Sequence, residues 1–474
     1  MGASESVGHS NIFMSSIKTP MAPNFALPSL ITYFADFSEL NNKRISWKTL
    51  YKKEDKIVDY TLVKDNLYYV SAKDAKNNFV AHTSLKKTDF LKAEIIIPEM
   101  EDEVIGSVYS IKDGLFVTTT KNGVESKLYF YTSQAKLNEI VLPIPSGNIK
   151  LTTKSNSYSD IWVTCSGWIN ADKRYKYNVS ENKFTSENIN TIIEFADFKH
   201  IKVLETTVKS HDGKDIPLSI IYNKELNPKE KLPLLVLGYG AYANSYNPFY
   251  AKIALLWVIK GGIVAYTHVR GGGEKGEEWH LGGFKKTKPN SWKDFISCIE
   301  YMHEKGYSSP SKTAIWGSSA GGIVMGRTMT EKPDLIKAVI IAAGTLNTIR
   351  METAPNGPNN IKEFGTVKNK DEFGYLYEMD SYHHIKKGTK YPATLITGGY
   401  NDPRVPIWIS AKFAAKLMAD NTSKNPVLIK VDFDGGHGID NTKKKAYEDI
   451  ADIFAFAFWQ LGHPDYQPKE NTKK

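Results

Sequence analysis

Cysteine is scarce in this chain of 474 residues, which contains only Cys165 and Cys298. Two cysteines far apart in sequence do not form the disulfide framework that is typical of small secreted domains. The start of the chain also lacks the basic and apolar segments of a secretory signal peptide. These absences favour a reducing compartment, and we expect a cytoplasmic protein.

Long apolar runs and clusters of basic residues are absent as well. No run approaches the roughly 20 apolar residues that span a bilayer, so we expect no membrane segment. The net charge of +9 arises from 61 basic and 52 acidic residues, but the lysines are interspersed with acids. A nucleic-acid-binding surface needs clustered basic side chains, so we expect no nucleic-acid partner.

The first part of the chain consists of short β-rich segments separated by turn residues. Three such sets occupy residues 56–85, 103–133 and 149–179. They recur about every 40 to 50 residues, which is the period of a propeller blade. We therefore predict a β-propeller-like domain of about four blades over residues 1–205, with an ordinary antiparallel β-domain as the alternative.

Residues 206–474 follow a different pattern, in which continuous apolar runs alternate with helical segments. The runs include PLLVLGYG, GGIVAYTHV and IKAVIIAAG. Runs without polar alternation are typical of strands that are covered on both faces. Residues 290–310 between them carry apolar side chains at helical spacing. The alternation predicts a mostly parallel sheet flanked by helices.

A short glycine-rich segment, GSSAG from Gly317 to Gly321, contains a candidate nucleophile. A serine hydroxyl reacts only with a base in hydrogen-bond reach and with donors for the developing oxyanion. The pattern G-x-S-x-G places its central serine on a strained turn between a strand and a helix, where only small neighbours fit. Ser319 occupies the central position and Ser318 the variable one, so Ser319 is the candidate.

An acid and a base follow in the order serine, aspartate, histidine that this arrangement uses. The run ATLITGG leads into NDPRVP, which offers Asp402, and VLIKVDFD leads into GGHGID, which offers His437. Each position alone would be an ordinary loop residue. Because the carboxyl ends of parallel strands meet at one edge of a sheet, the ordered set predicts a catalytic triad.

The segment GGGEKG satisfies the dinucleotide fingerprint G-x-G-x-x-G through Gly271, Gly273 and Gly276. Residues 277–291 after it do not have the sequence pattern of a helix, so no helix N-terminus is predicted to bind a pyrophosphate. We therefore expect no dinucleotide-binding site here.

Six segments in this order resemble the prolyl oligopeptidase family of serine peptidases, from about Glu205 to the C-terminus: KSHDGKDIPLSIIYNK, LGYGAYANS, THVRGGGEKGEEWHLGG, GSSAGG, NDPRVP and GGHG. The resemblance implies an α/β-hydrolase domain over residues 206–474 behind a β-propeller. It implies a peptide as the substrate and chemistry without a metal or organic cofactor. It leaves the oligomeric state unknown.

The resemblance also implies catalytic roles. Ser319 would be the nucleophile, His437 the general base and then the acid, and Asp402 the group that orients the imidazole. The Tyr239 hydroxyl and the Ala320 N–H would donate to the oxyanion.

The substrate-binding residues are implied in the same way. Arg404 would hold a peptide carbonyl of the substrate, and Tyr242, Phe364 and Val405 would line an apolar pocket. Asn360 stands near the position of the tryptophan on which a substrate proline stacks in prolyl oligopeptidases. Small apolar residues before the cleaved bond are therefore expected as well as proline.

The expected propeller is incomplete, because the family has seven blades. Either this propeller is smaller or the chain lacks part of the usual protein. Two other functions stay open at this point. The same triad could serve a carboxylesterase or acyl-peptide hydrolase, and a catalytically silent protein could use the propeller as a binding surface.

Overall fold

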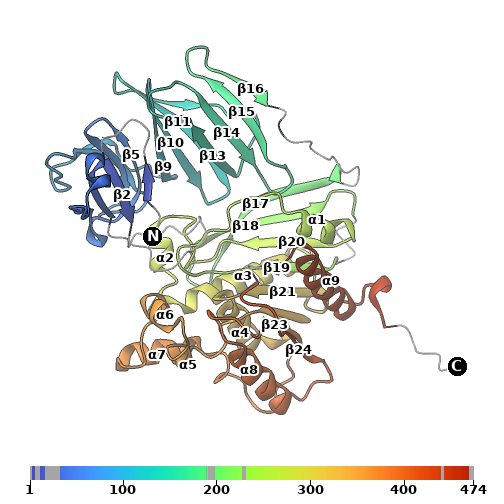
Figure 1. Ribbon diagram of the computed structural model, residues 1–474. Helices are drawn as coiled ribbons and strands as arrows, with labels where there is room; N and C mark the ends of the chain where they lie inside the picture. The colour runs from blue at the N-terminus through green and yellow to red at the C-terminus, as the bar shows by residue number, and fades with distance from the viewer. Residues whose placement is uncertain are drawn as a thin grey trace. The chain divides into compact units, whose positions relative to one another are not determined.

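The computed structural model describes residues 3–5, 11–15, 32–187, 189, 198–226, 231–438 and 442–468. Their contacts divide the chain into two compact units (Figure 1). Unit 1 comprises Met1–Ile193 with the short segments Ala243–Tyr250 and Gly273–Glu278, and unit 2 comprises the remainder. The division after Ile193 precedes the predicted boundary at residues 205 and 206, which falls inside strand β17 (Ile201–Lys209).

The described residues of unit 1 form four sheets, each of four antiparallel strands in which every strand pairs with the next along the chain. The sheets are β1 (Ala3–Glu5), β2 (Asn11–Ser15), β3 (Thr32–Asp36) and β4 (Lys48–Tyr51); β5 (Ile57–Val63), β6 (Asn66–Ser71), β7 (Phe79–Ser84) and β8 (Glu94–Ile97); β9 (Val104–Ile111), β10 (Gly114–Lys121), β11 (Glu125–Thr132) and β12 (Leu137–Ile140); and β13 (Asn148–Thr153), β14 (Ile161–Ser166), β15 (Lys173–Asn178) and β16 (Lys183–Glu187). The prediction of propeller-like blades is confirmed.

Side-chain alternation explains how these sheets pack. In β14, Ile161, Val163 and Cys165 are fully buried at every second position, as expected when one face of a strand faces a core. They join Phe116 of β10 and Tyr177 of β15 in one apolar cluster. Two neighbouring sheets thus share a core, which neither could form alone.

The glycine-rich segment divides between the units, and its part from Gly273 onward belongs to unit 1. A Cβ on Gly276 would lie 2.0 Å from the carbonyl oxygen of Lys76, and its φ of +76° also favours glycine. Glu277 pairs with Lys56 at 2.8 Å. The expectation that no helix follows is wrong, because α2 spans Glu277–Leu281. The helix has only five residues, too few to show a helical period, and two acids in its first turn would repel a phosphate.

Unit 2 is built on an eight-stranded sheet in the order β17-β18-β20-β19-β21-β22-β23-β24. Its strands after β17 are β18 (Asp215–Asn223), β19 (Leu234–Leu237), β20 (Ile263–Thr267), β21 (Thr313–Ser318), β22 (Ala338–Ala342), β23 (Ala393–Gly399) and β24 (Val427–Asp432). The pairs from β20 to β24 are parallel, whereas β17, β18 and β20 pair antiparallel. The predicted mostly parallel sheet is confirmed.

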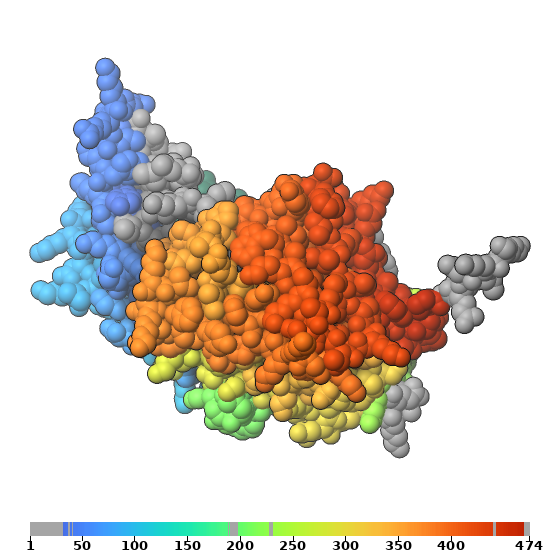
Figure 2. All heavy atoms as spheres, turned by 90° about the horizontal axis from the view of Figure 1, so that it is seen from below, coloured from blue at the N-terminus to red at the C-terminus, as the bar shows by residue number. Residues whose placement is uncertain are grey.

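Helices pack against this sheet. They are α1 (Lys252–Ile259), α3 (Pro289–Glu304), α4 (Gly321–Glu331), α8 (Ile407–Asp420) and α9 (Lys443–Gln460). Two further helices, α5 (Thr348–Met351) and α6 (Gly357–Phe364), contact α7 (Lys370–Met379), and all three are orange in Figures 1 and 2. The helices α1 and α9 lie side by side (Figure 1), and Trp257 of α1 stacks on Phe458 of α9 with ring centroids 3.9 Å apart. Trp292 and Phe295 of α3 are buried in the main apolar cluster. No helix in the described part of the chain is long and apolar enough to cross a membrane.

A buried ion pair fixes the loop after β20. The Arg270 guanidinium bonds both oxygens of Asp294, at 2.6 and 2.9 Å, and also pairs with Asp212 at 2.5 Å. The Arg270 side chain is 6% exposed and the Asp294 side chain is inaccessible. Although burial opposes a charged guanidinium, its bonds to the two carboxylates hold the pKa of Arg270 above its ordinary value. The charge is therefore stable only while its carboxylates are present.

We expect Asp294→Ala to lower the free energy of unfolding by about 3–5 kcal/mol, because it leaves Arg270 buried without its main partner. Asp215→Ala is the control. Asp215 pairs with Lys209 at a site where the side chains are 49% and 70% exposed, and such pairs contribute at most about 1 kcal/mol. Urea denaturation of the three proteins measures the difference. Equal losses in both variants would contradict the assignment.

Candidate active site

Ser319 lies on the turn between β21 and α4 and has a φ of +52°, in the left-handed region. A non-glycine residue held there stores about 1–3 kcal/mol of strain, so its surroundings must impose the conformation. The backbone N–H of Ser319 donates to Ala342 at 2.9 Å, and the N–H of Thr345 donates to the Ser319 carbonyl at 2.9 Å. The turn is thus clamped to the end of β22.

The glycines of GSSAG are required by close packing. A Cβ on Gly317 would lie 2.7 Å from Cγ of Met325, and one on Gly321 would lie 3.0 Å from the Gly238 carbonyl oxygen. Larger residues would push α4 away from the sheet. The strained turn expected from the sequence pattern is present.

The structure brings Ser319, Asp402 and His437 together at the ends of three parallel strands. Nε2 of His437 lies 3.1 Å from the Ser319 hydroxyl oxygen, and Nδ1 lies 2.6 Å from Oδ2 of Asp402. The other Asp402 oxygen accepts the backbone N–H groups of Arg404 and Val405, at 2.8 and 2.9 Å. Because an ionised carboxylate only accepts, Nδ1 of His437 carries the proton and Nε2 is free to accept from Ser319.

The two predicted oxyanion donors also lie beside Ser319. Tyr239 follows β19, and a Cβ on Gly321 would come within 3.3 Å of Cδ2 of its ring, so the tyrosine flanks the start of α4. Ala320 directly precedes α4. Its N–H belongs to the amides at a helix N-terminus that have no intrahelical acceptor, where the helix dipole also favours negative charge.

Two of the predicted pocket residues, Tyr242 and Phe364, are neighbours. The rings of Tyr242 and Phe364 meet edge to face, with centroids 5.4 Å apart. Val405 is buried in the same apolar cluster as Phe364. Asn360 is buried on α6, and its Oδ1 accepts the Tyr242 hydroxyl at 2.8 Å. A polar contact therefore stands where the resemblance suggested a stacking ring.

Arg404 is partly exposed, and its backbone rather than its side chain bonds Asp402. Among the described residues no acidic side chain pairs with its guanidinium.

Three residues at this site carried no signal in the sequence. Glu363 accepts the backbone N–H of Tyr242 at 2.7 Å and pairs with His280 at 2.9 Å. Lys288 is fully buried, and its ammonium donates to the carbonyl of Gly240. Lys288 stands in the run KKTK, which is typical of a solvent-exposed surface. No local pattern distinguishes it from its neighbours.

Burial and neighbouring charges shift the pKa values of Lys288 and Glu363. Desolvation lowers the pKa of Lys288 to about 8, against a smaller opposing effect of Glu363. Burial alone would raise the pKa of Glu363, but the hydrogen bond from His280 and the charges of His280 and Lys288 hold it below the ordinary value. Lys288 and Glu363 are therefore interacting charged groups, and each bonds the backbone of residues 240–242, next to Tyr239.

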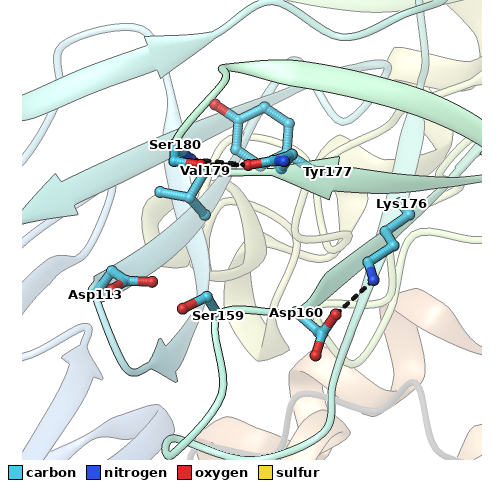
Figure 3. Close-up of a pocket in the computed structure, with 8 residues that line it drawn as sticks. Asp113, Ser159, Asp160, Lys176, Tyr177, Val179 and Ser180 are labelled. Atoms are coloured by element: carbon cyan, nitrogen blue, oxygen red, sulfur yellow. Dashed lines mark hydrogen bonds and ion pairs between the residues drawn. The ribbon is translucent and has the colours of Figure 1, made fainter.

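A separate hollow of about 640 Å³ lies in unit 1 (Figure 3). Lys176 bonds Asp160 at its edge at 2.6 Å. Its lining residues are Asp113, Ser159, Asp160, Lys176, Tyr177, Asn178, Val179 and Ser180, none of which is a predicted site residue. Within the described residues, no three His, Cys, Asp or Glu side chains are grouped so as to hold a metal ion.

Comparison with known proteins gives one consistent result. The prolyl oligopeptidase family matches residues 248–464. A prolyl endopeptidase of Elizabethkingia meningoseptica is 30% identical over 84% of this chain and 56% of its own length, and one of Dictyostelium discoideum is 31% identical over 77% and 49%. The structure of prolyl oligopeptidase B from Galerina marginata, bound to a 35mer hydrolysis and macrocyclization substrate, is 25% identical with a TM-score of 0.86, covering 97% of this chain and 65% of that one. This chain spans less than two thirds of each of these proteins.

We expect a fluorophosphonate to label Ser319 and not Ser318, although Ser318 is the more exposed serine. Only Ser319 has its hydroxyl within reach of His437, and an unactivated serine does not attack. Peptide mapping by mass spectrometry locates the adduct. Ser318→Ala should still be labelled and His437→Ala should not, and an adduct on Ser318 would refute the assignment.

Proposed function

The chain belongs to the prolyl oligopeptidase family, and on that premise we propose that it is a serine peptidase that hydrolyses short peptides through an acyl-enzyme intermediate. The observation that carries the proposal is the hydrogen-bonded series from Asp402 through His437 to Ser319. The names of the relatives agree with it, since both are prolyl endopeptidases. The reaction needs no metal or organic cofactor.

Attack begins at Ser319. As its oxygen adds to the scissile carbonyl, the hydroxyl proton passes to Nε2 of His437, and Asp402 stabilises the imidazolium through Nδ1. The two backbone N–H groups on the second Asp402 oxygen hold the carboxylate in the plane that this bond requires. His437 then donates the proton to the leaving amine, and a water attacks the acyl-enzyme by the same route.

The negative charge that develops on the carbonyl oxygen is met by the Tyr239 hydroxyl and the Ala320 N–H. Removal of one such donor typically costs about 100- to 1,000-fold in kcat. Tyr239 lies on the loop after β19, so its effect depends on how firmly that loop is held.

Substrate binding involves Arg404 and the pocket. The Arg404 guanidinium donates to a substrate carbonyl, while Tyr242, Phe364 and Val405 accept a small or medium apolar side chain before the cleaved bond. Asn360 offers no ring on which proline can stack, and an aromatic contact contributes about 0.5–1.5 kcal/mol beyond its area. Proline is therefore accepted without a large advantage.

The chain should cleave fluorogenic peptides, and Ser319→Ala should reduce kcat by at least about 10,000-fold because the nucleophile is lost. Ser318→Ala is the matched control and should change kcat less than about three-fold, because Ser318 is not part of the hydrogen-bonded series. Parallel assays on simple esters separate the alternatives. Hydrolysis of esters alone would indicate a carboxylesterase, and no turnover of either substrate would indicate a silent binding protein.

For peptides that differ only before the cleaved bond, we expect kcat/KM for proline and alanine to differ by less than about ten-fold. Asn360→Trp should raise the ratio of proline to alanine, because it supplies a ring beside Tyr242. The ratio is independent of the fraction of active enzyme, which matters because Asn360 is buried. Asn359→Trp places the same ring on an exposed position of α6 and should leave the ratio unchanged. A strong proline preference in the unmodified chain would contradict this account.

A further inference from the structure

The segment of residues 239–242, which begins with Tyr239, has an unusual backbone. Gly240 has a φ of +68° and Tyr242 a φ of +59°, so two residues within three positions adopt left-handed conformations. Tyrosine at such an angle is strained, and the strain persists only where neighbouring groups impose it. The conformation directs Tyr239 toward α4 and Tyr242 toward α6.

Two charged side chains hold this segment at its two ends. The Lys288 ammonium donates to the Gly240 carbonyl. The Ser291 hydroxyl, whose shorter bond goes to the Arg270 carbonyl at 2.6 Å, lies 3.3 Å from the same Gly240 oxygen. The Glu363 carboxylate accepts the N–H of Tyr242 at 2.7 Å. The peptide units on either side of Ala241 are thus fixed by an ammonium and by a carboxylate.

Lys288 is an uncommon kind of buried charge. Lysine is almost never fully buried unless it is paired, because desolvation of an ammonium is expensive. Arg270 is compensated by two carboxylates, whereas the hydrogen bond from Lys288 goes to a backbone carbonyl. The ammonium also lies 5.3 Å from the centroid of the Phe364 ring. The buried Lys288 ammonium therefore acts mainly by holding the Gly240 carbonyl in place.

We propose that Lys288 is a positioning residue, which holds the Gly240 carbonyl and thereby fixes the Tyr239 hydroxyl where the oxyanion forms, with Glu363 holding the far end of the segment. This inference rests on the proposed function. A donor must lie within a few tenths of an ångström of its position before reaction, since a displacement of about 1 Å can cost 100-fold in rate. Lys288 itself does not touch the substrate.

The protonation of Lys288 offers a second readout. Because burial lowers its pKa to about 8, a rise in pH through that value turns a charge-assisted hydrogen bond into a weaker neutral one. Among the described residues, the charge of Glu363 on α6 acts on Lys288 and opposes this lowering, and Glu363 in turn pairs with His280 of α2 at 2.9 Å. We expect kcat to fall to a lower plateau through pH 8.

The stability of the protein changes in the opposite direction. The folded pKa of Lys288 lies below its ordinary value, so the unfolded chain binds more protons between about pH 8 and 10.5. The contribution of Lys288 to the free energy of unfolding therefore rises with pH over this window. A fall in kcat there is not explained by unfolding caused by this group.

A double-mutant cycle tests the proposal. Tyr239→Phe removes the hydroxyl and should lower kcat about 100- to 1,000-fold. Lys288→Met should lower kcat about 10- to 100-fold with KM changed less than about three-fold, because the hydroxyl is displaced in the transition state. In the Tyr239→Phe background the same substitution should cost less than about three-fold, since there is no hydroxyl left to position.

Lys312→Met is the matched control. The Lys312 ammonium also donates to a backbone carbonyl, that of Leu461 at 2.8 Å, but at the opposite end of β21 from Ser319. It should leave kcat unchanged. Additive losses in the cycle, or an equal loss in Lys312→Met, would overturn the proposal.

If Lys288→Met fails to fold, the pH profile of kcat decides. The step near pH 8 should occur in the unmodified chain and be absent from Tyr239→Phe. A step in both proteins, or in neither, overturns the proposal. Failure of the peptidase assignment would appear separately, as turnover that survives Ser319→Ala.

Discussion

The hydrogen bond between Asp402 and His437 is the contact on which the geometry of the site depends. It joins the loop after β23 to the loop after β24, and His437 in turn reaches the turn after β21. Each loop has a fixed origin because its strand is paired in the parallel part of the sheet. The remaining bonds of Asp402 go to its own loop, so the carboxylate keeps one orientation. A small shift of any of the three strands would break the series.

The start of α3 plays a comparable part on the other side of Ser319. Ser291 donates to the carbonyl of Arg270 at 2.6 Å and also reaches Gly240. The loops after β19 and β20 lie so close that a Cβ on Gly271 would come within 2.1 Å of the Gly240 carbonyl oxygen. Lys288 and the ion pair of Arg270 thus stabilise one compact support. Tyr239 directly precedes the Gly240 carbonyl that this support holds, so under the proposed mechanism the buried charges position the donor to the oxyanion.

Several features of the site could be predicted because they depend on neighbours in sequence. The strained turn at Ser319 is encoded by the glycines around it, and the order of Asp402 and His437 follows from apolar runs that end in loops. The blades of unit 1 followed from the spacing of β-rich segments. The short helix α2 escaped prediction because five residues carry no detectable period, and its position depends on packing against Lys76 and Lys56.

The sequence by itself determined the class of the longer segments, the strand ends at which the candidate catalytic side chains lie, and the family resemblance, because these follow from local spacing and local turn chemistry. Only the tertiary structure decided that Lys288 is buried while its neighbours in the same run are not, and that Asn360 bonds the hydroxyl of Tyr242. Lys288 and Asn360 lie 48 and 118 positions from the residues that they bind. Such contacts form when separate loops pack together. A periodicity or motif within one segment does not indicate which distant atom a side chain of that segment will contact.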